Sequence, residues 1–110
     1  MPPDNFDTLR QELRRGALSL AVLGHLKREH YGYSLRKALL DEGVDIDEGT
    51  LYPLLRRLEN QGLLKSKWRE DHNRNKRFYR LAPEGERLLN DLVEEWRGLN
   101  ASLDRILEEN

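Results

Sequence analysis

Apolar residues recur at intervals of three and four along the first long segment, which runs from about Asp7 to Glu29. This spacing predicts a helix with one apolar stripe, formed by Leu9, Leu13, Ala17, Leu20, Leu23 and Leu26. Gly16 lies within the segment, and glycine is unfavourable in a helix interior. The pattern therefore leaves open whether one continuous helix or two shorter pieces form.

Two shorter helices are predicted next, the first from about Ser34 to Leu40 and the second from an N-cap at Asp47 to about Gln61. The buried face of the second helix consists of leucines at i, i+3, i+4 and i+7, namely Leu51, Leu54, Leu55 and Leu58. Pro53 interrupts it, because proline has no N–H to donate within a helix. Either the helix begins near Tyr52, with Pro53 at its first position, or it tolerates a kink.

A hairpin is predicted after these helices. The segments Leu63 to Arg69 and Arg77 to Ala82 each alternate with a period of two, which is typical of strands. The residues between them, Glu70 to Lys76, are charged or are asparagines that favour turns. We therefore expect two strands joined by a polar loop.

The final helix is predicted from Pro83, at its first position, to about Leu107. Its apolar residues are spaced 3, 4, 3, 4 and 3 apart, which is a heptad seam, formed by Leu89, Leu92, Trp96, Leu99, Leu103 and Ile106. About 25 helical residues span roughly 37 Å, more than so small a domain can cover. We expect the seam, with Leu9 and Leu13, to pair with a second copy of the chain; the alternative is that it packs only on the first helix.

Length and composition narrow the class of protein. The chain has 110 residues, which predicts one domain. It has no cysteine, which excludes a disulfide scaffold and a thiolate metal site. Its longest stretch without a charged residue, 16–26, is far shorter than a membrane span requires, and its first residues do not resemble a secretory signal. We therefore expect a cytoplasmic protein.

The net charge of −1 conceals a strong asymmetry. Residues 56–80 hold nine basic and three acidic side chains, whereas residues 84–110 hold three basic and eight acidic ones. A basic middle segment is the electrostatic pattern expected of a nucleic-acid-binding surface, although a solvated face would also be charged.

The predicted order of elements, which is three helices followed by a basic hairpin, is that of a winged helix-turn-helix, whose third helix enters the DNA major groove. We therefore expect a mainly α fold with a two-stranded β wing, with residues 1–82 as the DNA-binding part and 83–110 as an integral C-terminal dimerisation helix. Arginine and asparagine can bond bases, and hydroxyl groups can bond phosphates. The expected DNA-binding residues are Tyr33, Ser34, Gly49, Thr50, Tyr52, Pro53, Arg56, Arg57, Asn60, Arg74, Lys76 and Arg77.

Several segments together resemble the PadR family of bacterial transcriptional regulators. They are Tyr31-Gly32-Tyr33-Ser34-Leu35, the run from Gly49 to Glu59 that contains Gly-Thr-Leu-Tyr-Pro, Gly62-Leu63-Leu64, Arg77-Phe78-Tyr79-Arg80-Leu81, Pro83-Glu84-Gly85 and Trp96. The resemblance extends from about Leu13 to Leu107 and is to the branch with one C-terminal helix. It implies a homodimeric repressor that binds a palindromic operator. The chain departs from the family at Ala82, where a threonine usually caps the last helix.

The same resemblance implies an effector, since members of the family respond to phenolic acids or flat hydrophobic compounds. The expected effector-binding residues are Leu13, Leu20, Val93, Trp96 and Asn100; alternatively, Trp96 only fills the core. The scattered His25, His30 and His72 have no metal-site spacing, and no catalytic motif is present, so we expect no metal, cofactor or enzyme activity. A winged-helix module that binds proteins instead of DNA is the alternative function.

Overall fold

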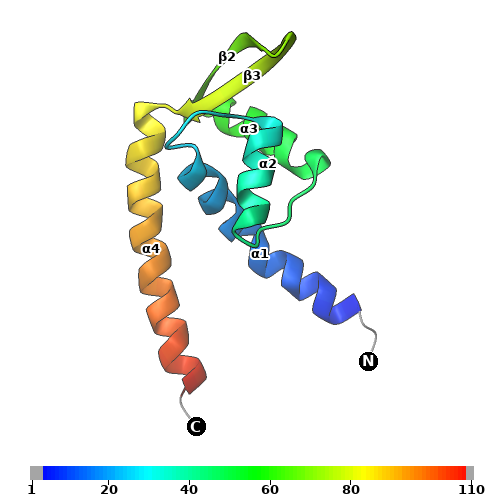
Figure 1. Cartoon of the computed structure of the whole chain (residues 1–110). Helices are drawn as coiled ribbons and strands as arrows, with labels where there is room; N and C mark the ends of the chain where they lie inside the picture. Colours follow the sequence, from blue (N-terminus) through cyan, green and yellow to red (C-terminus); the bar gives the residue numbers. More distant parts are fainter. Residues whose placement is uncertain (1–3, 109–110) are drawn as a thin grey trace.

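The structure is a computed structural model that describes residues 4–108; the remaining residues of the expected ranges 1–82 and 83–110 lie outside this part. Its elements follow the order α1 (Asp4–His25), β1 (His30–Tyr31), α2 (Gly32–Asp41), α3 (Glu48–Asn60), β2 (Leu64–Asp71), β3 (Arg74–Leu81) and α4 (Pro83–Glu108). Figure 1 shows α1 and α4 diverging toward the two termini, with the β2–β3 hairpin at the opposite end of the molecule. No helix in residues 4–108 is both long and apolar enough to cross a membrane.

Helix α1 is continuous through Gly16, so the alternative of two separate pieces is wrong. It begins three residues earlier and ends four residues earlier than the sequence predicts. Only its second half is packed against the rest of the chain: Val22 and Leu23 are fully buried, whereas Leu9 and Leu13 are exposed. The first half of α1 therefore presents an apolar stripe that this chain does not cover.

The hairpin is longer than predicted, because the segment expected to be a loop continues both strands. Asp71 pairs with Arg74, so only His72 and Asn73 form the turn. Both have positive φ angles, 53° and 64°, which is the requirement of a tight two-residue hairpin turn. The segment shows no apolar alternation, since the residues near the turn are charged or polar on both faces of the ribbon.

A short third strand, β1, was not predicted. It pairs antiparallel with β3, with His30 opposite Tyr79 and Tyr31 opposite Phe78. The sheet in residues 4–108 therefore has the order β1-β3-β2, instead of two strands alone. Two residues are too few to show a period along the sequence, so only the folded chain reveals this strand.

One apolar core lies between the helices and the base of the hairpin. Helices α1 and α2 contribute to it, as do all four predicted leucines of α3. Helix α4 contributes Leu89, which is only 3% exposed, and half-buried Leu92 and Val93 pack against it. The start of α4 is therefore part of the core, whereas its later apolar residues are exposed.

Helix α4 begins at Pro83 as predicted and packs closely on the base of the hairpin. The N–H of Ala82 donates to the carbonyl of Leu63 at 2.9 Å. A Cβ atom built at Gly85 would overlap that carbonyl oxygen and come within 3.1 Å of the Leu81 side chain. Gly85 therefore allows the helix to lie directly against the chain entering β2.

We expect Gly85→Ala to lower the free energy of unfolding by about 1–3 kcal/mol, because the added methyl group forces α4 away from Leu63. Urea denaturation at fixed protein concentration measures the change. Gly98→Ala is the matched control in the same helix, since nothing lies within 4 Å of a Cβ there; it should raise stability by about 0.5–1 kcal/mol. Equal effects at the two positions would contradict the close contact at Gly85.

Candidate nucleic-acid interface

Helix α3 combines a buried leucine face with a polar outward face. The Asp47 side chain caps its start by accepting from the Thr50 N–H at 2.8 Å, and the hydrogen bonds from Thr50 hold the pKa of the Asp47 carboxyl below its ordinary value. The helix begins at Glu48, so the interpretation that it begins near Tyr52 is wrong and Pro53 lies inside it. Its exposed residues include Gly49, Thr50, Pro53, Arg56, Arg57 and Asn60.

The hairpin is tied to the end of α3 by Glu59. One carboxylate oxygen of Glu59 accepts from the Arg77 guanidinium at 2.7 Å, and the other accepts from the Ser66 hydroxyl. The Nε–H of Arg77 also donates to the Ser66 oxygen at 3.0 Å. This triad of Glu59, Ser66 and Arg77 joins both strands of the hairpin to the helix, so the sequence-predicted DNA ligand Arg77 lies in a structural ion pair.

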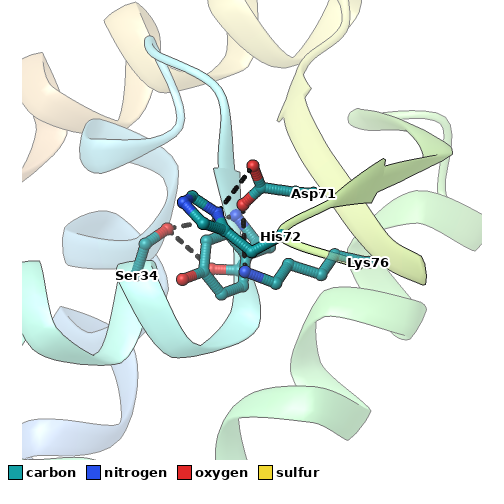
Figure 2. Close-up of polar contacts among 5 residues, drawn as sticks. Ser34, Asp71, His72 and Lys76 are labelled. Atoms are coloured by element: carbon teal, nitrogen blue, oxygen red, sulfur yellow. Dashed lines mark hydrogen bonds and ion pairs between the residues drawn. The ribbon is translucent and has the colours of Figure 1, made fainter. Parts of the chain in front are cut away.

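The turn of the hairpin is similarly tied to the start of α2. Asp71 lies between Lys76, at 2.9 Å, and His72, at 3.1 Å (Figure 2). Hydrogen bonds from these two side chains lower the pKa of the Asp71 carboxyl, and the bond to Asp71 raises the pKa of Lys76. The Lys76 ammonium also lies 4.2 Å from the centre of the Tyr31 ring. Most of the Lys76 side chain is buried by these contacts.

Ser34, another predicted DNA ligand, is engaged within the first turn of α2. Its hydroxyl accepts from the Tyr31 N–H at 3.2 Å and donates to the Tyr31 carbonyl at 3.0 Å. Its oxygen also lies 3.0 Å from His30 Nδ1. The adjacent Tyr33 is 60% exposed, so it is the more accessible of the two predicted residues.

The other face of the hairpin carries basic residues whose charge is partly compensated. Arg69 and Lys67 pair with Glu29 at 2.9 and 3.8 Å, and the hydrogen bond from Arg69 lowers the pKa of the Glu29 carboxyl. By contrast, Arg56, Arg57 and Arg74 form no ion pair with a carboxylate in residues 4–108. These three guanidinium groups are therefore free to meet an anionic partner.

The fold brings many of the predicted residues to a single concave region between α2, α3 and the hairpin. Those that line its cavity are Tyr33, Tyr52, Arg56, Arg74, Lys76 and Arg77. Sequence reasoning missed Tyr31, Gly32, Trp68 and Tyr79, which line the same cavity. The strand alternation carried part of this signal, since the register places Ser66 opposite Tyr79 and Trp68 opposite Arg77.

Comparison with known proteins identifies the family of this chain. Residues 20–91 match the model of the transcriptional regulator PadR-like family. The chain belongs to this family. It is 42% identical to a PadR family transcriptional regulator from Eggerthella lenta, whose crystal structure superposes with a TM-score of 0.89 and covers 97% of this chain and 96% of that one.

Two further relatives of the PadR-like chain support the assignment. A transcriptional regulator of Mycobacterium tuberculosis, Rv3488, is 39% identical over 82 residues, which cover 74% of this chain and 77% of that protein. A PadR-like transcription factor from Bacteroides fragilis is 32% identical, with a TM-score of 0.76 and coverage of 90% and 98%. The sequence-based family and mainly α winged-helix fold are confirmed, and the family consists of transcriptional regulators, not enzymes.

We expect Arg77→Ala to lower the free energy of unfolding by about 1–2 kcal/mol, because it leaves the half-buried Glu59 without its charged partner. Amide hydrogen exchange should accelerate in both strands of the hairpin. Arg74→Ala is the control on the same strand, since Arg74 is exposed, and it should change stability by less than about 0.5 kcal/mol. Unchanged exchange rates in Arg77→Ala would show that the triad does not hold the hairpin on α3.

Proposed function

We propose that this PadR-family chain is a homodimeric repressor that binds a palindromic operator in double-stranded DNA and acts in the cytoplasm. The observation that carries the DNA-binding part is the exposed face of α3. Arg56 and Arg57 on this face form no ion pair within residues 4–108, and Arg56 lines the same cavity as the equally unpaired Arg74 of the hairpin. Arginine groups in this state can bond guanine or neutralise phosphates without first breaking an internal pair.

The roles divide according to position. On α3, Arg56, Arg57 and Asn60 are proposed to read base edges in the major groove, while Gly49 and Pro53 allow close approach of the backbone. Phosphates are proposed to meet Arg74 and the hydroxyl groups of Tyr33, Thr50 and Tyr52. Ser34, whose proton is donated to the Tyr31 carbonyl, is proposed to support this surface by holding the start of α2. Lys76 and Arg77 are proposed to act mainly by holding the hairpin in place, because each is paired with a carboxylate.

We expect Arg56→Ala to reduce discrimination between operator and random duplex by about 1–3 kcal/mol. Arg74→Ala should instead weaken binding to all sequences alike and reduce the salt slope by about one. Fluorescence anisotropy titrations at several salt concentrations measure both, with the region upstream of the chain's own coding sequence as the first operator candidate. An unchanged ratio in Arg56→Ala would remove it from base recognition, and salt-insensitive or absent binding to every duplex would favour a protein-binding module.

The dimer is supported by exposed apolar side chains on α1 and α4, the two helices that diverge toward the termini (Figure 1). They are Leu9 and Leu13 from α1 and, from α4, Trp96, Leu99, Leu103 and Ile106. Several large apolar side chains exposed along each helix are more than a monomer usually leaves uncovered. Leu89 lies in the chain's own core and half-buried Leu92 packs against it, so we propose that the intermolecular part of the seam starts near Trp96.

We expect Leu99→Asp to dissociate the dimer, because it would bury a charge in the apolar seam. Sedimentation at micromolar concentration should give the mass of one chain for this variant and of two chains for the parent. Ala101→Asp adds the same charge to the same helix away from the seam and should remain dimeric. An intact Leu99→Asp dimer would refute this interface.

We also propose that a small aromatic or hydrophobic effector releases the repressor by binding near Trp96, in a cleft walled by Leu13, Leu20, Val93 and Asn100. Trp96 is 47% exposed in the single chain, so its indole ring is available to a planar compound that binds between the two subunits. The distance between the two α3 helices of the dimer sets how well both fit the operator. A ligand that binds more tightly at one distance than at another would therefore change the affinity for the operator.

A planar aromatic effector should quench the fluorescence of Trp96 and weaken operator binding over the same concentration range. For an uncharged compound both effects should be lost in Trp96→Leu, in which Trp68 supplies the remaining fluorescence. Quenching without any change in operator affinity would indicate that Trp96 is only a packing residue.

A further inference from the structure

A cavity of about 550 Å³ lies between α3, the hairpin and the segment where β1 passes into α2. This volume is within the range of small-molecule sites. It is distinct from the apolar surface of α1 and α4, since none of its lining residues belongs to either helix. Its chemistry therefore calls for an explanation separate from dimerisation.

Five of the twelve residues that line the cavity are aromatic, among them Tyr31 at the end of β1. Tyr33 from α2, Tyr52 from α3 and Trp68 and Tyr79 from the hairpin all line it. The Tyr52 ring is seated against Gly32, where a Cβ atom would come within 2.5 Å of the ring carbon Cε1. Tyr79 is buried, whereas Trp68 is 61% exposed, so the cavity has a fixed inner wall and an accessible outer ring.

The charges in the cavity are all of one sign. Arg56, Arg74, Lys76 and Arg77 line it, and no aspartate or glutamate does. The charges of Lys76 and Arg77 are neutralised by ion pairs with Asp71 and Glu59, respectively, and neither carboxylate lines the cavity. Arg56 and Arg74 have no such partner in the described chain, so they supply net positive charge at the cavity itself.

This combination selects the chemical class of a ligand. Flat aromatic walls favour a planar ring, which gains by offset stacking or edge-to-face contact. Unpaired guanidinium groups favour an anionic substituent, because they form charge-assisted and often bidentate hydrogen bonds with carboxylates and phosphates. A cationic ligand is disfavoured by the four like charges, although aromatic walls alone would accept one.

We propose that this cavity is a binding site for a small planar aromatic anion, such as an aromatic carboxylate or a nucleoside monophosphate. The link to regulation rests on the proposed DNA-binding function. Since Tyr33, Arg56 and Arg74 are also the proposed DNA contacts, the anion and DNA compete for the same groups. Such a ligand releases DNA by direct displacement, whereas a compound bound at Trp96 acts through the dimer.

The test uses the full chain labelled with 5-fluorotryptophan, which gives one fluorine NMR signal for Trp68 and one for Trp96. Each is assigned with the corresponding Trp→Phe variant. The probes are 1-naphthoate and adenosine 5′-monophosphate, which separate the two sources of the anion. 1-Naphthamide lacks the charge and cyclohexanecarboxylate lacks the aromatic ring, so both serve as controls. At least one probe should shift the Trp68 signal saturably, with far smaller effects from either control.

The double variant Arg56→Gln with Arg74→Gln should weaken probe binding about tenfold or more, since it removes the charge-assisted hydrogen bonds. Lys65→Gln with Arg80→Gln is the matched control, because these residues face each other across the same hairpin and neither lines the cavity. That control should bind the probe as the parent does. A probe that shifts only Trp96, or a naphthamide that binds as well as naphthoate, would overturn the proposal.

Competition is measured separately, by titrating labelled duplex into the parent at increasing probe concentration and constant ionic strength. The apparent Kd for DNA should rise in proportion to the probe. If Trp68 responds but no duplex binds, the site stands and the DNA-binding function fails; if duplex binds but Trp68 never responds, the site fails. Simultaneous binding of probe and duplex would overturn the displacement mechanism.

Discussion

The position of α3 depends on the burial of its leucine face, and the rest of the polar surface depends on the position of α3. Leu51 and Leu55 are almost completely inaccessible to solvent, and Leu54 and Leu58 nearly so. Only one rotation of α3 about its axis buries all four leucines in the core. In that rotation Arg56, Arg57 and Asn60 point outward. The cap at Asp47 then fixes where the helix starts, so both the rotation and the first residue of the proposed reading helix are set by local sequence.

The hairpin is oriented by a different kind of contact. Its base joins the core through Leu64 and Leu81, whereas the described core includes no residue of its outer half, 68–77. There the carboxylates of Glu59 and Asp71 hold Arg77 and Lys76 in half-buried ion pairs. The strength of such an ion pair depends on the positions of its atoms more than on the surface area that it buries, so these pairs constrain the angle between the hairpin and the helix. The unpaired arginines remain available on the surface.

The sequence predicted those features that are encoded locally. The cap at Asp47 and the start of α4 at Pro83 were read correctly because each is signalled by one residue type at one position. The length of the hairpin was not, because near its turn both faces are polar and alternation carries no contrast. The strand at His30 and Tyr31 was missed since its evidence is the pairing with β3, which is remote in sequence.

The proposed site was predicted in the same uneven way. The outward residues of α3 follow from helical periodicity, so they could be named in advance. The pairing of Arg77 with Glu59 could not, because eighteen positions separate them and many basic residues compete for each carboxylate. The cavity is still harder to predict from the sequence, since its walls come from three separate segments of the chain.

The tight turn at His72 and Asn73 has a consequence for how related chains can vary in length. Each strand leaves the turn with its side chains alternating between the two faces of the ribbon, so one added residue per strand would exchange those faces. Two added residues per strand preserve them and extend the reach by about 7 Å. The strands of this hairpin can therefore be lengthened, in natural or engineered variants, only in steps of two residues each. Such a change alters how far along a groove the hairpin extends, while Trp68 and Arg77 keep their orientation toward α3.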